Sequence, residues 1–347
     1  MTGTKPKVLV VCPGRGTYNK EELGYLSRYH SGQSEWIDSV DQKRTEQKQT
    51  TLRDLDNAAR YHLKNHTRGD NASALIYACA LLDYKAIDRT QYDICAITGN
   101  SMGWYIALAC AGALDNDGAF DVINTMGTLM HQEMIGGQII YPFVDGNWHQ
   151  IPGRKEWIHA QMAKSAVETG HELYVSIELG GMLVLAGHEI ALQHLSTLLP
   201  VQQDRFPMAL FQHAAFHTPL QAPVAQLGRQ RLPSALFHMP HTPLIDGRGN
   251  TWFPNSADPN ALWDYTLDQQ VCETYDFTRS IQHAVKEFAP DKIIITGPGN
   301  SLGGAVAQAL VDINWYGLAS KQDFIDRQKI DPIVLAMGND EQRALVI

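Results

Sequence analysis

Short, almost wholly apolar runs alternate along the chain with segments of helical periodicity. The runs at 7–12 and 292–295 are typical of central strands in a parallel sheet that is covered on both faces. The apolar segment at 71–82 predicts a helix that packs on such a sheet. A further strand is expected at 94–97, followed after a glycine-rich turn by a helix at 105–114. Strands that alternate with helices in this way predict an α/β fold.

The pattern changes between residues 135 and 213. The elements expected there, in chain order, are a strand at 138–144, a helix at 155–167, strands at 173–177 and 182–186, a helix at 188–199 and a strand at 208–213. This order is that of a small ferredoxin-like α+β unit. We therefore predict a large α/β-hydrolase-like domain with a parallel sheet, built from residues 1–134 and 214–347, and a small ferredoxin-like subdomain inserted at 135–213.

Two segments of the sequence show no strong periodicity of apolar residues. Residues 18–70 are polar and charged, and we expect helices joined by loops in an excursion on the surface. Pro219 excludes a continuing helix or a central strand at its position. A stretch with many prolines then runs to Pro259 and is expected to consist mainly of loops.

Charge and composition exclude several classes of protein. The net charge is −9, whereas a nucleic-acid footprint needs clustered lysine and arginine. There is no apolar run of 18 residues, and the N-terminal residues lead directly into an apolar strand. We therefore expect a cytoplasmic protein without a signal peptide, with neither nucleic acid nor membrane as a partner.

The cysteines and histidines predict no metal site. The five cysteines are scattered, form no C-x-x-C pair and are interpreted as reduced residues of the core: Cys12, Cys79, Cys95, Cys110 and Cys272. His62 and His66 are four residues apart on a predicted helix, but no glutamate completes the H-E-x-x-H pattern. A solvated helix face is the favoured interpretation of that pair.

The turn at 99–103 has the pattern G-x-S-x-G, formed by Gly99, Ser101 and Gly103. In a nucleophile elbow the turn between a strand and its helix is so tight that only small residues fit beside the serine. The serine side chain then projects above the sheet, near the positive end of the helix dipole. The pattern predicts a nucleophilic serine.

A second copy of the pattern surrounds Ser301, also after a predicted strand. Pro298 and an additional glycine separate that serine from its strand, so the geometry of an elbow favours Ser101. A serine needs a base to accept its proton. Among the fourteen histidines, His213 and His217 are the leading candidates, because both lie where the chain leaves the inserted unit.

Four motifs, in order, resemble those of one family. PGRG at 13–16 is similar to the family's PGQG, GNSMGW at 99–104 to GHSLGE, FHTPL at 216–220 to FHSPL, and GPGNSLG at 297–303 to GPGxxL. The chain therefore resembles the malonyl-CoA:acyl-carrier-protein transacylases and the related acyltransferase domains of polyketide synthases. The resemblance spans nearly the whole chain except the polar region near 19–70.

The resemblance implies a role for several residues. Ser101 would be the acyl-accepting nucleophile and His217 its base, oriented by a backbone carbonyl close to Gln270. The backbone N–H groups of Met102 and Arg15 would form the oxyanion hole, which tolerates a change of side chain. The implied reaction carries an acyl group from acyl-CoA to the phosphopantetheine thiol of acyl carrier protein, in fatty acid or polyketide biosynthesis, without a bound cofactor.

Three departures from the family pattern concern the acyl pocket. The family arginine that pairs with the malonyl carboxylate is Met126 here, and the pocket positions beside the serine are Asn100 and Trp104. A methionine cannot replace a charge-assisted pair. An uncharged acyl group is therefore favoured, with malonyl as the alternative and Arg15 as a possible substitute guanidinium.

Two other functions are compatible with the sequence. Acyl-Ser101 could be released to water, which would make the protein an acyl-thioester hydrolase acting on acyl carrier protein. An inactive partner that only docks a carrier protein is a third hypothesis. The presence of both Ser101 and His217 argues against the inactive partner.

Overall fold

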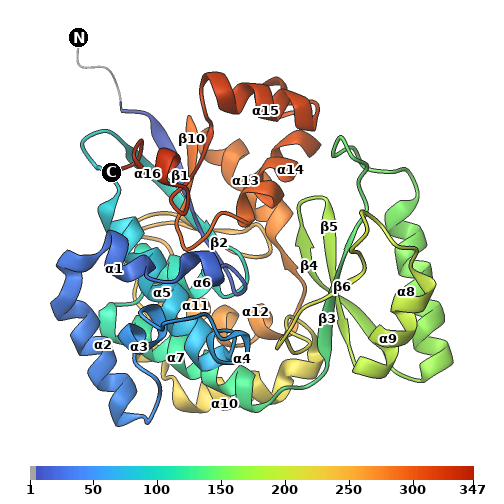
Figure 1. Ribbon diagram of the computed structural model, residues 1–347, viewed down its shortest axis with the longest axis horizontal. Helices are drawn as coiled ribbons and strands as arrows, with labels where there is room; N and C mark the ends of the chain where they lie inside the picture. Colours follow the sequence, from blue (N-terminus) through green and yellow to red (C-terminus); the bar gives the residue numbers. More distant parts are fainter. Residues whose placement is uncertain (1–4) are drawn as a thin grey trace.

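The computed structural model describes residues 5–347, which form two sheets with helices around them (Figure 1). The large sheet has six strands in the order β11-β10-β1-β2-β7-β8, and every neighbouring pair is parallel except β7 with β8. Its strands are β1 (Lys7–Cys12), β2 (Asp93–Gly99), β7 (Leu244–Ile245), β8 (Thr251–Trp252), β10 (Lys292–Ile295) and β11 (Val334–Ala336). The predicted bounds of β1 and β10 are confirmed.

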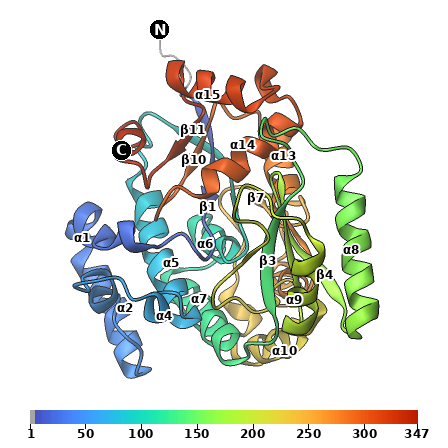
Figure 2. The same ribbon diagram turned by 45° about the vertical axis from the view of Figure 1, so that its right-hand side comes forward.

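Helices cover both faces of this sheet. Figure 2 shows α5 (Gly69–Ala86) and α6 (Gly103–Cys110) on one side and α13 (Phe277–Phe288) and α14 (Leu302–Asp312) on the other. The strand side chains between them are buried, which explains why these strands carry continuous apolar runs. The α/β fold predicted from the alternating pattern is confirmed.

The remaining α-helices outside the second sheet's unit have ten residues or fewer, apart from α2 and α7. They are α1 (Tyr25–Tyr29), α2 (Ser34–Glu46), α3 (Leu52–Asp56), α4 (Leu63–His66), α7 (Asn116–Gln132), α10 (Ala222–Arg231), α11 (Pro259–Leu267), α12 (Gln269–Cys272), α15 (Lys321–Ile330) and α16 (Asp340–Arg343). The expectation of a loop-rich stretch before Pro259 missed α10. Pro223 lies in the first turn of that helix, where a missing N–H costs no hydrogen bond.

The second sheet has five strands in the order β6-β3-β5-β4-β9. Its elements are β3 (Gly137–Pro142), α8 (Arg154–Thr169), β4 (Leu173–Leu179), β5 (Met182–Gly187), α9 (Glu189–Leu198), β6 (Met208–Ala209) and β9 (Tyr275–Asp276). The first four strands in this order have the predicted ferredoxin-like arrangement. Two details differ: β6 has two residues where six were expected, and β9 joins from outside the predicted insertion.

The polar region near the N-terminus is partly buried, so the expected surface excursion is only partly correct. The guanidinium of Arg44 on α2 is fully buried and donates hydrogen bonds to Asn71 on α5 (2.8 Å) and Asn124 on α7 (3.0 Å). Val40 on α2 and Leu52 on α3 are also buried. A polar side chain therefore connects this region to the core, and apolar periodicity alone could not reveal the contact.

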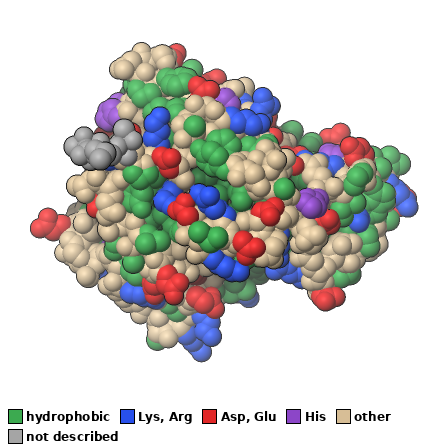
Figure 3. Space-filling model, turned by 90° about the horizontal axis from the view of Figure 1, so that it is seen from above, with side chains coloured by type: hydrophobic (Ala, Val, Ile, Leu, Met, Phe, Trp, Pro, Cys, Tyr) green, Lys and Arg blue, Asp and Glu red, His purple; other side chains and the backbone are tan. Residues whose placement is uncertain are grey.

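The surface carries charges of both signs. On the face shown in Figure 3, acidic and basic side chains are interspersed. Among the described residues, no helix is both long and apolar enough to cross a bilayer. All five cysteines are free thiols, and three of them are buried in the core.

Gly103, at the start of α6, is expected to tolerate no side chain. A Cβ at this position would lie 2.2 Å from the carbonyl oxygen of Cys12, at the end of the neighbouring strand. Because backbone atoms would have to move, we expect Gly103→Ala to lower the free energy of unfolding by about 3 kcal/mol or more in urea denaturation. Gly304→Ala is the control, since nothing lies within 4 Å of a Cβ there. A loss below about 1 kcal/mol for Gly103→Ala would contradict this packing.

Candidate active site

Two glycine-containing loops meet at the carboxyl ends of β1 and β2. Cys12, the last residue of β1, pairs with Gly99, the last residue of β2, so both loops begin at the same edge of the sheet. A Cβ on Gly14 would lie only 2.6 Å from the carbonyl oxygen of Asn100. The absence of a side chain at Gly14 therefore lets the first loop lie against the elbow, which places Arg15 beside Ser101.

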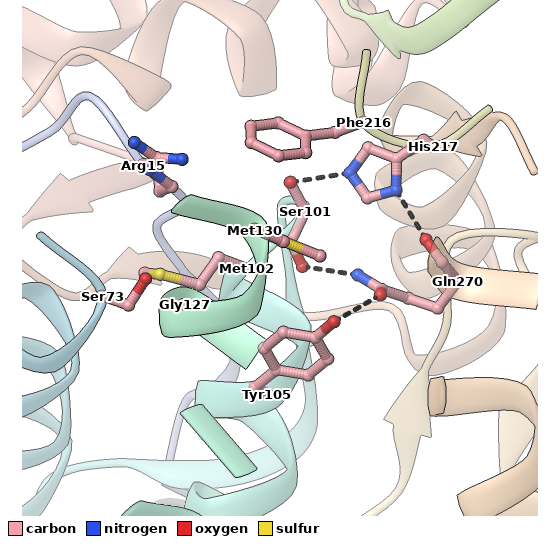
Figure 4. A pocket seen from close by; sticks show the side chains of 10 residues that line it. All are labelled: Arg15, Ser73, Ser101, Met102, Tyr105, Gly127, Met130, Phe216, His217 and Gln270. Atoms are coloured by element: carbon pink, nitrogen blue, oxygen red, sulfur yellow. Dashed lines mark hydrogen bonds between the residues drawn. The ribbon is translucent and has the colours of Figure 1, made fainter. Parts of the chain in front are cut away.

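Ser101, His217 and Gln270 form a chain of hydrogen bonds (Figure 4). The Nε2 atom of His217 is 2.7 Å from the Oγ atom of Ser101, and its Nδ1 atom is 2.6 Å from the backbone oxygen of Gln270. A carbonyl oxygen only accepts, so Nδ1 carries the proton and Nε2 presents its lone pair to the serine hydroxyl. The arrangement is that of a nucleophile, its base and a group that orients the base.

Ser101 and His217 both adopt left-handed backbone conformations, each with φ of 56°. For residues with a side chain, such a conformation costs about 1–3 kcal/mol. The sharp turn at Ser101 is the turn that the G-x-S-x-G pattern predicts. Strain at both members of a hydrogen-bonded pair is typical of a functional site.

Burial lowers the pKa of His217 to about 4, although its hydrogen bond to Gln270 acts in the opposite direction. His217 is therefore neutral at physiological pH and able to accept a proton. His213, the competing candidate, lies apart from Ser101: its Nδ1 atom is 2.8 Å from the side-chain oxygen of Gln138. Burial, aided by the positive charge of Arg15, lowers its pKa to about 3.

The lowered pKa of His217 predicts the pH dependence of acylation. A base works only when deprotonated, so the rate should stay level from pH 8 down to about pH 5 and fall tenfold per unit below about pH 4. An ordinary histidine would lose half its activity near pH 6.5. Single-turnover acylation between pH 4 and 8 measures this profile. A midpoint near pH 6.5 would show that His217 is not held in an apolar environment.

Two tyrosines lie against the hydrogen-bonded chain of Ser101, His217 and Gln270, and the sequence interpretation included neither as a site residue. Tyr105, one helical turn after Ser101, donates a hydrogen bond to the side-chain oxygen of Gln270 at 2.9 Å, while the Gln270 amide donates to the Ser101 carbonyl at 3.1 Å. Tyr275 on β9 donates to the carbonyl of Gly99 at 2.5 Å, with its ring centroid 5.3 Å from that of His217. The sequence signal that could have identified Tyr105 was its spacing, one helical turn after Ser101. Nothing in the sequence pointed to Tyr275.

A small cavity adjoins the serine. Five of its lining residues were predicted from the sequence as site residues, and five were not. The lining residues are Arg15, Ser73, Ser101, Met102, Tyr105, Gly127, Met130, Phe216, His217 and Gln270. The wall is therefore mainly apolar, with one charged group.

The predicted oxyanion donors are available for that role. Within residues 5–347, neither the N–H of Met102 nor that of Arg15 donates a hydrogen bond to another protein group. Both residues line the cavity beside Ser101. Two free N–H groups beside a nucleophile are the donors that an oxyanion requires.

Three residues expected in the pocket wall lie outside the cavity lining. The indole of Trp104 is fully buried and donates a hydrogen bond to Thr266 at 3.0 Å. The sulfur of Met126 faces α10, where a Cβ on Gly228 would lie 2.7 Å from it. Asn100 contacts the first loop through its backbone, with its N–H donating to the Cys12 carbonyl at 3.0 Å. From α7, the helix that carries Met126, the cavity wall instead includes Gly127 and Met130.

The other candidate groups lie elsewhere. Ser301 is exposed at the start of α14, and in the described chain its hydroxyl bonds no histidine. The His66 ring is buried, with Nδ1 accepting from the His62 N–H and Nε2 3.0 Å from the Leu55 carbonyl. Since both ring nitrogens of His66 are occupied, the pair is not arranged to hold a metal.

Comparisons with known proteins give sequence relatives over part of the chain. It is 23% identical over 216 residues to the malonyl CoA-acyl carrier protein transacylase of Escherichia coli K12, and 23% identical over 225 residues to that of Haemophilus influenzae. Each match covers 62% of this chain and 66% of the relative, slightly less than two thirds of its length. No family model matches the chain.

Solved structures match over almost the whole chain. The transacylase of Xanthomonas oryzae pv. oryzae superposes with a TM-score of 0.76 at 17% identity, covering 99% of this chain and 98% of its own. An acyltransferase domain of the salinomycin polyketide synthase gives a TM-score of 0.72 at 18% identity, covering 97% and 70%. These comparisons confirm the resemblance stated from the four motifs: the chain is related in sequence to the malonyl-CoA:acyl-carrier-protein transacylases and has the fold of that family.

Proposed function

We propose that this protein is an acyltransferase that moves an acyl group from coenzyme A to the phosphopantetheine thiol of an acyl carrier protein, through an acyl-Ser101 intermediate. The observation that carries the proposal is the hydrogen-bond chain from Ser101 through His217 to the Gln270 carbonyl. It lies beside two free backbone donors and an apolar cavity. This combination supports acyl transfer through a serine ester.

In the first half of the proposed reaction, the Ser101 oxygen attacks the thioester carbon while its proton moves to Nε2 of His217. The carbonyl oxygen becomes negative, and the N–H groups of Met102 and Arg15 donate hydrogen bonds to it. The C–S bond then breaks, His217 returns its proton to the departing sulfur, and free coenzyme A leaves. Ser101 is left as an ester, and His217 is neutral again.

In the second half, the phosphopantetheine thiol takes the place of coenzyme A. His217 accepts the thiol proton, the sulfur attacks the ester carbon, and the proton passes to the Ser101 oxygen as its bond to the acyl group breaks. The Gln270 carbonyl accepts a hydrogen bond from Nδ1 of His217 at 2.6 Å throughout. It orients the ring and stabilises the transient imidazolium without carrying a full negative charge.

Acyl carrier protein as acceptor is supported by the relatives. One solved structure with a TM-score of 0.72 and 16% identity is a type II polyketide synthase acyl carrier protein in complex with its malonyl-transacylase. The sequence prediction of an uncharged acyl group depended on Met126, which lies outside the cavity wall. The preferred acyl group must therefore be inferred from the side chains that line the cavity.

A partition assay tests the proposed function. The protein is incubated with radiolabelled malonyl-, acetyl- and octanoyl-CoA, with holo-carrier protein or with apo-carrier protein, which lacks the thiol. Transfer predicts label on the holo form only. Rapid release of free acid in the presence of holo-carrier protein would indicate the hydrolase instead. Carrier binding without any label on protein or carrier would indicate an inactive docking partner.

A further inference from the structure

Gln270 contacts both members of the reacting pair. Its backbone oxygen accepts a hydrogen bond from Nδ1 of His217 at 2.6 Å, and its side-chain nitrogen donates to the carbonyl of Ser101 at 3.1 Å. With the 2.7 Å contact between His217 and Ser101, these bonds form a closed hydrogen-bonded triangle of three residues (Figure 4). The distance between the base and the nucleophile therefore depends on where Gln270 is held.

The helix that carries Gln270 is too short to fix its own position. α12 has only four residues, Gln269–Cys272. A single helical turn has little stability in water, because the first turn orders several residues for one hydrogen bond. The position of α12 must therefore come from contacts with neighbouring elements.

Two consecutive residues of α6 provide such contacts. The indole N–H of Trp104 donates to the Thr266 hydroxyl on α11 at 3.0 Å, and the hydroxyl of Tyr105 donates to Oε1 of Gln270 at 2.9 Å. α6 begins at Gly103, directly after the elbow that carries the nucleophile. These two bonds therefore connect the segment that orients the base to the helix that follows the nucleophile.

The direction of each bond at the Gln270 amide follows from the chemistry of its partners. The Ser101 carbonyl can only accept, so the amide nitrogen faces it and the amide oxygen faces Tyr105. Tyr105 and Gln270 are both 2% exposed, and no other donor to this amide oxygen is present in the described chain. Without the Tyr105 hydroxyl the oxygen would be buried and unpaired, which favours another orientation of the amide.

We propose that Tyr105 is a positioning residue for acyl transfer that acts through Gln270. Its hydroxyl holds the amide in the orientation that closes the triangle between His217 and Ser101. The inference rests on the proposed function, because it takes these two residues as base and nucleophile. The same amide holds the carbonyl of Ser101, whose φ of 56° is a strained conformation that needs support from its surroundings.

The first test removes only the hydroxyl group. Tyr105→Phe should lower the single-turnover rate of Ser101 acylation about tenfold, because the reacting atoms are displaced, and should change the half-saturating acyl-CoA concentration less than twofold. Tyr77→Phe is the matched control, since that tyrosine is also buried but its hydroxyl has no hydrogen-bond partner in the described chain. The control should keep the natural rate within twofold. An equally small effect of Tyr105→Phe would overturn the proposal.

A double-mutant cycle separates positioning through Gln270 from a general loss of packing. Gln270→Met removes both side-chain hydrogen bonds but keeps the backbone oxygen that accepts from His217. If Tyr105 acts through the amide, Tyr105→Phe should change the rate less than twofold in the Gln270→Met protein. A tenfold loss in both backgrounds would overturn the proposal, because the hydroxyl would then act independently of Gln270.

A spectroscopic measurement needs neither a substrate nor the Gln270→Met protein. The Nδ1 proton of His217, in a hydrogen bond of 2.6 Å, should give a low-field NMR signal in protein with isotope-labelled histidine, assigned by its loss in His217→Asn. Tyr105→Phe should move this signal to higher field, whereas Tyr77→Phe should leave it in place. An unchanged signal in Tyr105→Phe would overturn the proposal. Absence of acyl-Ser101 with every thioester would instead contradict the proposed function, and the signal would then still decide whether Tyr105 holds the triangle.

Discussion

Replacement of Ser101 by alanine is expected to abolish labelling of the protein by acyl-CoA and to lower transfer to carrier protein by about 10⁴-fold or more. The reason is that the oxygen lost is the one 2.7 Å from the His217 base, and no other hydroxyl takes its place there. Ser301→Ala is the matched control, since that serine has the same sequence pattern but is exposed at the start of α14. Single-turnover labelling with radiolabelled acyl-CoA measures both.

The opposite pattern would overturn the assignment. Loss of labelling in Ser301→Ala with full labelling in Ser101→Ala would place the nucleophile at the second motif. The alanine at 101 removes only a hydroxyl group, so the fold should be retained. Thermal unfolding of both variants checks this, and a difference of more than a few degrees would require a second substitution, Ser101→Gly.

Replacement of His217 is expected to lower the rate of acylation about 10³-fold or more, because the serine then has no base. His217→Asn is the informative variant, since its amide nitrogen can still donate to the Gln270 carbonyl in place of Nδ1 while the Nε2 acceptor is lost. His213→Asn, at the competing histidine, should lower the rate less than fivefold. Stopped-flow acylation under single-turnover conditions measures all three proteins.

Two outcomes would contradict this role. If His213→Asn were acylated as slowly as His217→Asn, the hydrogen bond between His217 and Ser101 would not be enough to identify His217 as the base. If His217→Asn kept more than about a tenth of the rate, the hydrogen bond at 2.7 Å would be structural and the serine would need another activating group.

The fold was largely predictable where the chain has continuous apolar runs. β1 and β10 were predicted at their observed bounds, because a strand covered on both faces needs apolar residues at every position. The extent of short elements was less predictable. β6 was expected over six residues and has two, and β9, also of two residues, was not predicted at all. Both strands form by pairing with β3 and β4, which no local pattern encodes. α10 was missed because prolines near it were interpreted as loop signals.

The contact between Ser101 and His217 was predictable, but the cavity wall was not. Ser101 and His217 are 116 residues apart, and only their motifs, together with the family resemblance, connected them before the structure did. Met126 and Gly127 are adjacent on α7, yet one faces α10 and the other the cavity, because successive residues of a helix point about 100° apart. Similarly, the Arg15 backbone was predicted as an oxyanion donor, while the two buried nitrogens of its side chain that lack a hydrogen-bond partner in the described chain became visible only with its neighbours in place.

The central claim is that Ser101 carries the acyl group between the two thiols. The most direct measurement isolates the protein after brief exposure to malonyl-CoA, locates the added mass by peptide mapping, and then adds holo-carrier protein. We predict one acyl group per chain on Ser101, and its passage to the carrier thiol without release of free acid. An adduct on another residue, or an acyl-Ser101 that yields only free acid when the carrier is added, would contradict the proposed transfer.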